Sequence, residues 1–326
     1  MMTIPFRFGC TVMSFALVLG SVLHAAETAE VPAKKVLVFT KSSGFQHDAV
    51  KLEGPPGHGF AFPVLRKLGA KNKIELTFSK DGTLFTSEYL AQFDGFVFYT
   101  TQDLTQAKTE AGADGLPPMT ADGKAALLQA IKDGKGFVGV HSATDTFQAP
   151  GTAVYGPGRH QSDGDKADPF IKMLGGEFIN HGAQQAGRLS VADTKFPGMS
   201  AVPADFGMYD EWYSLKNFAP DLHVLLVQNT ARMVGEVYVR PPYPSTWARM
   251  EGKGRVFYTS MGHREDVWNH PTFQSILEGG LNWSLGRVDA DVTPNLDKVA
   301  PGANELPKYV EPAPAPAAAK KAEKKK

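Results

Sequence analysis

The chain has 326 residues, of which 42% are hydrophobic and 21% are charged, so it can bury a sizeable core. Its 34 basic and 34 acidic residues balance, which excludes the basic surface typical of nucleic-acid binding and gives no reason to expect a strongly acidic substrate. The chain has a single cysteine, Cys10, so it cannot form an internal disulfide. Cys10 lies in an N-terminal segment that resembles a cleavable leader, and without this segment the chain has no thiol nucleophile or thiolate ligand. Any chemistry must then use histidines, carboxylates, hydroxyls, or a metal held by nitrogen and oxygen atoms.

The first 25 residues are typical of a secretory signal peptide. Arg7 gives a positively charged start, residues 8–23 form an apolar run, and Ala25 and Ala26 offer a small-residue cleavage site. No later segment has the roughly 18 consecutive apolar residues that a membrane helix requires. We therefore expect an exported protein, periplasmic or secreted, with no transmembrane segment after cleavage.

The first half of the mature chain alternates short apolar strands with helices. The strands are expected at residues 35–40, 74–78, 93–101 and 136–141. Helices are expected at 60–68, ending at Gly69, and after the cap residue Thr120, ending at Gly134. This order predicts a flavodoxin-like, three-layer α/β fold, in which a doubly wound and mostly parallel sheet has helices on both faces.

The second half is less regular. Its strands are expected at residues 222–228, 246–250 and 255–260, with a hairpin turn at 251–254. A last helix begins at Pro271 and ends at Gly286. The composition changes at Val288 and becomes rich in proline, alanine and lysine, so residues 288–326 are expected to be a disordered tail after a domain at 34–287.

Several histidines follow predicted strands, where α/β sheets bind their ligands. His47 follows the first strand, His141 ends the fourth, and His263 follows the strand at 255–260, while His181 lies in a polar loop. Together these imidazoles can enter one pocket. Three or four nitrogen and oxygen ligands suit zinc or a similar divalent ion, so a metal cofactor is a hypothesis that the spacing leaves open.

The segment Gly139-Val140-His141-Ser142-Ala143 has the small residues that a tight strand-to-helix elbow needs. His141 occupies the apex, where it can act as a base, a hydrogen-bond donor or a metal ligand, or simply cap its own loop. Asp145 lies four residues later, so on a helix it shares a face with His141 and can fix the imidazole tautomer. The alternative role for Asp145 is to satisfy backbone N–H groups at the helix start.

Asp210 and Glu211 are neighbours, and in an extended segment their side chains point to opposite faces. One of them is therefore expected in the crevice, and we predict Glu211 as the acid–base partner of His141. The alternative is that the carboxylate pairs with Arg249 or Arg255.

Three aromatic residues, Trp212, Tyr213 and Trp247, are candidates for a platform under a sugar ring. Aromatic residues in strands are also typical of a hydrophobic core.

Four segments resemble the ThuA-like family, which is named for a trehalose-utilisation protein. They are the first strand and loop through His47, the elbow at 141–145, the run at 210–213 and the block at 254–263. The resemblance extends over about residues 34–287 and implies a class I glutamine amidotransferase-like fold and a link to carbohydrate catabolism, including keto-sugars. Residues 149–168 depart from the family pattern, which puts the substrate preference in doubt.

The leading hypothesis is an exported enzyme that acts on a small carbohydrate or keto-sugar derivative by acid–base or metal-assisted chemistry. Its predicted catalytic residues are His141, Glu211, Asp145 and His263. Its predicted substrate-binding residues are His47, His181, Tyr213 and Trp247. The alternative is a non-catalytic carbohydrate-binding protein on the same scaffold, whereas a glutamine amidotransferase would lack its thiol. The sequence leaves open the reaction type (hydrolase, lyase or isomerase) and the oligomeric state.

Overall fold

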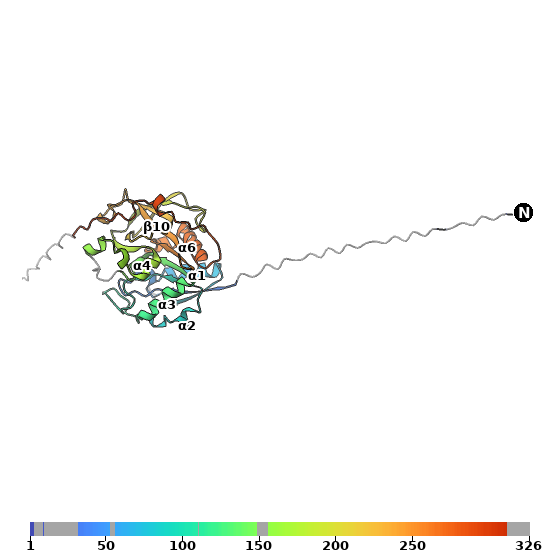
Figure 1. Cartoon of the computed structure of the whole chain (residues 1–326), viewed down its shortest axis with the longest axis horizontal. Helices are drawn as coiled ribbons and strands as arrows, with labels where there is room; N and C mark the ends of the chain where they lie inside the picture. The colour runs from blue at the N-terminus through green and yellow to red at the C-terminus, as the bar shows by residue number, and fades with distance from the viewer. Residues whose placement is uncertain (3–8, 10–31, 53–55, 110, 149–155, 312–326) are drawn as a thin grey trace, which may run out of the picture. The chain divides into compact units, whose positions relative to one another are not determined.

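The computed structural model describes residues 1–2, 9, 32–52, 56–109, 111–148 and 156–311 (Figure 1). The helices and strands all belong to the unit that begins at Ala33, which is separate from Met1–Pro32. The predicted signal peptide lies almost wholly outside the described residues and stays a prediction. Within the described part of the chain, no helix is both long and apolar enough to cross a bilayer.

A nine-stranded sheet has the order β2-β1-β3-β4-β11-β10-β9-β6-β7. Its parallel strands are β1 (Lys34–Phe39), β2 (Ile74–Ser79), β3 (Gly95–Phe98), β4 (Gly136–Val140) and β11 (Gly254–Thr259). Its antiparallel strands are β6 (Gln185–Val191), β7 (Asp205–Asp210), β9 (His223–Asn229) and β10 (Tyr243–Glu251). A separate antiparallel pair contains β5 (Glu177–His181) and β8 (Tyr213–Lys216). The predicted α/β fold with a parallel core is confirmed.

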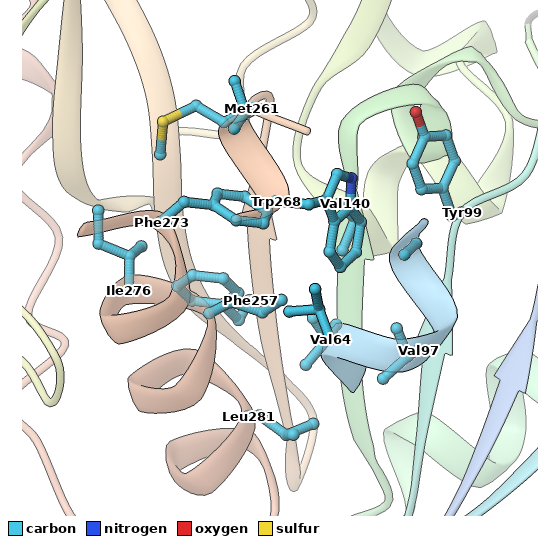
Figure 2. Close-up of a cluster of buried hydrophobic side chains, with 14 of the residues drawn as sticks. Val64, Val97, Tyr99, Val140, Phe257, Met261, Trp268, Phe273, Ile276 and Leu281 are labelled. Atoms are coloured by element: carbon cyan, nitrogen blue, oxygen red, sulfur yellow. The ribbon is translucent and has the colours of Figure 1, made fainter. Parts of the chain in front are cut away.

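Helices cover both faces of the sheet because successive strand side chains point to opposite sides. One core cluster contains Val36 and Val38 and is covered by α1 (Ala61–Lys71), α5 (Glu265–Trp268) and α6 (Pro271–Ser284). Figure 2 shows side chains of α1, β11 and α6 meeting in this cluster. The other cluster contains Leu37 and Phe39. It is covered by α2 (Ser87–Leu90), α3 (Ala121–Lys132), α4 (Pro169–Leu174) and α7 (Leu296–Val299).

Six short 3-10 helices complete the elements of the described chain. They are η1 (Asp48–Val50), η2 (Gly82–Leu84), η3 (His141–Asp145), η4 (Pro157–His160), η5 (Gly164–Lys166) and η6 (Glu236–Tyr238).

The helix boundaries follow local capping chemistry. Thr120 caps α3 as predicted, since its hydroxyl accepts a hydrogen bond from the backbone N–H of Gly123 at 2.9 Å. Helix α1 does not end at Gly69 but continues to Lys71. Gly69 is there for close packing, because a Cβ at this position would lie 2.9 Å from the carbonyl oxygen of Ile74.

The C-terminal segment differs from the predicted disordered tail. Residues 288–311 are described, and Leu296 is only 4% exposed in the core. The Asn295 side chain accepts a hydrogen bond from the Val224 backbone at 2.7 Å, and Arg240 donates to the carbonyl oxygen of Ala303. The domain therefore extends beyond residue 287. Hydrogen bonds to β9 and to Arg240 hold this segment in place, although its composition is unfavourable for folding. Residues 312–326 lie outside the described chain.

Candidate functional site

Three histidines and one glutamate meet at one edge of the sheet. His47, His141 and His263 follow the parallel strands β1, β4 and β11, whose carboxyl ends face the same way. Glu211 lies between β7 and β8. One ligand atom from each of these four side chains lies within 4.8 Å of every other. Segments that are far apart in the sequence thus place four titratable groups together.

The elbow at His141 fixes one imidazole nitrogen. His141 is fully buried and has a φ of 45°, a left-handed conformation that ends β4 one residue earlier than predicted. Its Nδ1 lies 2.8 Å from the backbone carbonyl oxygen of Ser260. Because a carbonyl only accepts hydrogen bonds, Nδ1 carries a proton, and the lone pair of a neutral imidazole is therefore on Nε2.

Glu211 is the charged centre of the cluster. Its Oε2 lies 3.1 Å from Nδ1 of His263 and 3.5 Å from Nε2 of His141, and its Oε1 lies 3.4 Å from Nδ1 of His181. Burial alone would raise the pKa of Glu211, but hydrogen bonds and charges of His141 and His263 hold it well below its usual value. Burial would lower the pKa of His263, yet Glu211 raises it, so the two groups form an ion pair when no metal is bound.

His47 and Tyr213 form the next layer of the site. His47 is 4% exposed, and its Nε2 lies 3.3 Å from the Tyr213 hydroxyl. Burial, followed by the nearby His141 and His263, lowers the pKa of His47 well below 6.5. Burial raises the pKa of Tyr213 well above 10, so its hydroxyl stays protonated and can donate. Nδ1 of His47 has no hydrogen-bond partner among the residues that the structure describes.

Gly262 fixes the position of His263. Its φ of 118° is accessible mainly to glycine, and a Cβ there would lie 3.3–3.4 Å from Val140, Phe273 and Trp268. Its carbonyl oxygen accepts hydrogen bonds from the Trp268 indole at 2.7 Å and the Tyr99 hydroxyl at 3.2 Å. Figure 2 shows Trp268 and Tyr99 in the adjoining core cluster.

Asp210 supports the same turn from within the protein. Its Oδ2 accepts a hydrogen bond from the Gly262 N–H at 2.8 Å, and burial raises its pKa. Asp210 and Glu211 thus have different surroundings, and Glu211 is the one that joins the histidines. The alternative pairing does not occur, since Arg249 binds Asp221 and Glu251 and Arg255 binds Asp289.

A cavity of about 620 Å³ opens beside the cluster. Its lining includes His47, His181, Glu211, Tyr213 and His263, together with Phe45, Gln102, Ala111, Gly112, Asp145, Arg159 and Phe178. Gln102 lies in the segment 100–103, which follows a predicted strand, whereas Phe45 and Arg159 were not predicted as site residues. Phe45 lies two residues before His47 in the same strand-end loop, so its position in the sequence could have indicated that it belongs to the site.

Asp145 does not orient His141. The Ser260 carbonyl oxygen occupies Nδ1 of His141, and the Asp145 carboxylate instead accepts from Gln102, Gln148 and Arg159. The cause is local geometry, because residues 141–145 form a 3-10 helix, in which positions four apart do not share a face.

Trp247 does not reach the cavity either. It is fully buried, its indole N–H donates to the Leu174 carbonyl oxygen at 2.8 Å, and its ring lies 4.3 Å from that of Tyr258. Trp212 is also fully buried and donates to the Gln185 carbonyl oxygen. Of the three proposed platform residues, only Tyr213 lines the cavity, and the two tryptophans belong to the core.

A doubly wound, mostly parallel sheet with an elbow at the end of a central strand defines a flavodoxin-like α/β protein, here with a histidine at the apex of the elbow. Within this class, the chain belongs to the ThuA family, described as trehalose utilisation, whose model matches residues 35–284.

Solved structures agree with this fold. A ThuA-like protein from Bacteroides uniformis is 20% identical and has a TM-score of 0.55, covering 80% of this chain and 95% of its own. A ThuA-like protein from Parabacteroides merdae is 16% identical and has a TM-score of 0.54, covering 86% of this chain and 98% of its own. A comparison with curated proteins found no match.

Proposed function

We propose that this protein is a metal-dependent enzyme that acts on a carbohydrate derivative carrying a carbonyl group. The observation that supports the proposal most directly is the convergence of lone pairs from His141, His263 and Glu211, with His47 beside them. Several titratable groups within hydrogen-bond reach of one another favour chemistry over passive binding. The family description, trehalose utilisation, supports the carbohydrate class.

The separations between these atoms suit a zinc-sized ion. Zinc binds nitrogen and oxygen ligands tetrahedrally at about 2.0–2.2 Å, which places neighbouring ligand atoms about 3.3–3.6 Å apart. The three observed separations are 3.3 Å for His141 to His263, 3.1 Å for His263 to Glu211 and 3.5 Å for His141 to Glu211. An ion at the centre of this triangle therefore requires only small movements of the side chains.

The locked tautomer of His141 supports its role as a ligand. Its Nδ1 donates to the Ser260 carbonyl oxygen, which is the arrangement that orients metal-binding imidazoles in general. A bound divalent ion would polarise a substrate carbonyl or lower the pKa of a bound water.

His47 is positioned to exchange protons with the substrate. It adjoins the three ligands and lines the cavity, and Tyr213 is hydrogen-bonded to its Nε2. In this proposal His47 accepts a proton from a bound water or from the carbon next to the carbonyl group. Hydration, elimination and isomerisation of a keto-sugar all require such a step.

We also propose that the protein is exported, to the periplasm or beyond, on the basis of the signal-like residues 1–25. N-terminal sequencing of the protein recovered from cell fractions tests this point. Recovery of the uncleaved chain from the cytoplasm alone would contradict it.

The metal proposal is tested with protein that has been stripped by a chelator and reloaded with zinc. We expect one zinc per chain by elemental analysis, and at least tenfold weaker affinity in Glu211→Gln and His263→Ala. His47→Gln should keep zinc within threefold of wild-type affinity and lose turnover in a screen of keto-disaccharides. Asp289→Asn, an exposed carboxylate paired with Arg255, is the control. Wild-type protein that takes up no zinc or other divalent ion would refute the proposal.

A further inference from the structure

The cavity contains a second polar group that the metal proposal does not use. Gln102, Asp145 and Arg159 line the same cavity as His181, Glu211 and His263. Asp145 is 7% exposed and Arg159 is 2% exposed, so the ion pair that they form is buried at a cavity wall. Burying ionised groups is unfavourable unless they are well paired, and a role in folding alone does not explain why they face a cavity.

Hydrogen bonds hold the Asp145 carboxylate in a defined orientation. Its Oδ1 accepts from Nε2 of Gln148 at 2.6 Å, from Nε2 of Gln102 at 3.2 Å and from Nη1 of Arg159 at 3.4 Å. The second oxygen lies 3.3 Å from the same Gln102 nitrogen. The Asp145 carboxylate is thus an oriented hydrogen-bond acceptor, and it lies next to amide and guanidinium N–H donors.

The backbone around Asp145 is strained. Among the non-glycine residues that the structure describes, five have a positive φ, and Gln102 at 60° and Phe147 at 50° are two of them. The Gln102 N–H donates to the Asp145 carbonyl oxygen at 2.8 Å, and the Phe147 N–H donates to the Gln102 carbonyl oxygen at 3.1 Å. Left-handed conformations of large residues are uncommon and concentrate at functional sites. The elbow residue His141 has the same property.

Aromatic rings adjoin these polar groups. Phe45 lines the cavity and is 53% exposed, so its ring is available to a ligand. Its ring lies 5.1 Å from that of His47. The Arg159 guanidinium lies 5.4 Å from the Phe178 ring, which is another part of the cavity lining.

This combination matches the chemistry of a hydroxylated ring. A sugar hydroxyl donates one hydrogen bond and accepts others, so a carboxylate beside an amide and a guanidinium can satisfy neighbouring hydroxyls at once. The C–H face of the ring packs on an exposed aromatic side chain.

We infer that Gln102, Asp145 and Arg159, with Phe45, form the subsite that binds the hydroxyl groups of a sugar ring and so directs its carbonyl group to the histidine cluster. This inference rests on the proposed function for the carbohydrate class of the ligand. The four residues position the substrate and do not take part in the proton transfer, because Asp145 is bonded to Gln102, Gln148 and Arg159 and not to a histidine of the cluster.

The test is sugar binding by saturation-transfer NMR, with trehalose, lactose and sucrose as the probes. These sugars have hydroxyl groups and no ketone, so we expect wild-type binding that changes less than twofold when zinc is removed. Asp145→Asn and Phe45→Ala should weaken binding at least fivefold. Gln102→Gly should also weaken it, and this variant guards against misfolding because glycine relieves the left-handed backbone. Asp289→Asn should bind like the wild type.

The outcomes separate this inference from the metal proposal. Absence of binding of all three sugars to wild-type protein overturns the subsite, whatever the zinc stoichiometry. Unchanged binding in the folded Gln102→Gly and Phe45→Ala variants overturns it as well. If the keto-disaccharide screen yields a substrate, Asp145→Asn should raise KM at least fivefold and leave kcat within threefold. A fall in kcat with unchanged KM would place Asp145 in the chemistry instead and contradict its positioning role.

Discussion

Lys80 lies away from the histidine cluster and makes a sharp prediction about stability. Its side chain is 7% exposed, and its Nζ donates to the Thr40 carbonyl oxygen at 2.5 Å. Burial lowers the pKa of Lys80 from 10.5 to about 8; Asp114 at 3.9 Å opposes this shift and Lys41 adds to it. Lys80→Met is therefore expected to change the free energy of unfolding in opposite directions at neutral and high pH.

The magnitude follows from the linkage between proton binding and folding. The folded pKa is below the unfolded one, so the unfolded chain binds more protons between about pH 8 and 10.5 and stability rises with pH in that window. At about 1.4 kcal/mol for each pH unit, the charged lysine lowers the stability by roughly 3 kcal/mol at pH 7 and by about 1 kcal/mol or less at pH 10. Loss of the hydrogen bond to Thr40 costs about 1–2 kcal/mol at either pH.

Lys80→Met should thus be more stable than the wild type by about 1–2 kcal/mol at pH 7, and equal to it or less stable at pH 10. The assay is urea denaturation at both pH values, followed by the fluorescence of the four tryptophans. Lys80→Arg is the matched control, because arginine remains charged throughout and its deficit relative to the wild type should grow with pH. The reasoning is refuted if the difference between Lys80→Met and the wild type is the same at pH 7 and pH 10.

Three further predictions concern the site and the C-terminal segment. Zinc at 100 times its dissociation constant should stabilise the wild type by about 2.7 kcal/mol and have no such effect on Glu211→Gln, measured by thermal unfolding. Gly262→Ala should lower stability by about 2 kcal/mol and weaken zinc binding, whereas Gly115→Ala, also at a positive φ but with open space around it, should leave zinc titrations unchanged. Arg240→Met should lower stability by about 3 kcal/mol in urea titrations, since three buried acceptors lose their donor, and it should expose the segment after 288 to proteolysis.

The parallel half of the fold was predictable because its strands are short apolar runs. Strand β4 is buried at every position, so its sequence has no polar alternation and indicates a central strand. Once the strands are known, the placement of His47, His141 and His263 at one edge follows from the shared direction of β1, β4 and β11. The sequence then left one choice open, which was whether Asp210 or Glu211 joins the histidines.

The remaining features depend on contacts that local sequence does not encode. Trp247 is buried by Leu174, which is 73 residues away, and nothing in β10 alone indicates which of its aromatic residues meets α4. Asp145 does not share a face with His141 because a 3-10 helix has 3.0 residues per turn, whereas an α-helix has 3.6. The prediction of disorder was wrong for residues 288–311 because composition cannot detect a few specific anchors such as the contact of Arg240 with Ala303.

In related folds the residue at the apex of this elbow is a nucleophile. In this protein the apex residue is a histidine, and its surroundings favour a different role. A nucleophile at the apex must be exposed to attack its substrate. His141 is fully buried, and the Ser260 carbonyl oxygen holds one of its nitrogens, so the ring cannot turn and only Nε2 is available. A fixed lone pair that faces Glu211 and His263 suits a ligand better than a base that must gain and lose a proton. Our proposal therefore assigns the acid–base role to His47 instead of His141. The Tyr213 partner of His47 is a hydroxyl that can either donate or accept when the imidazole changes its protonation.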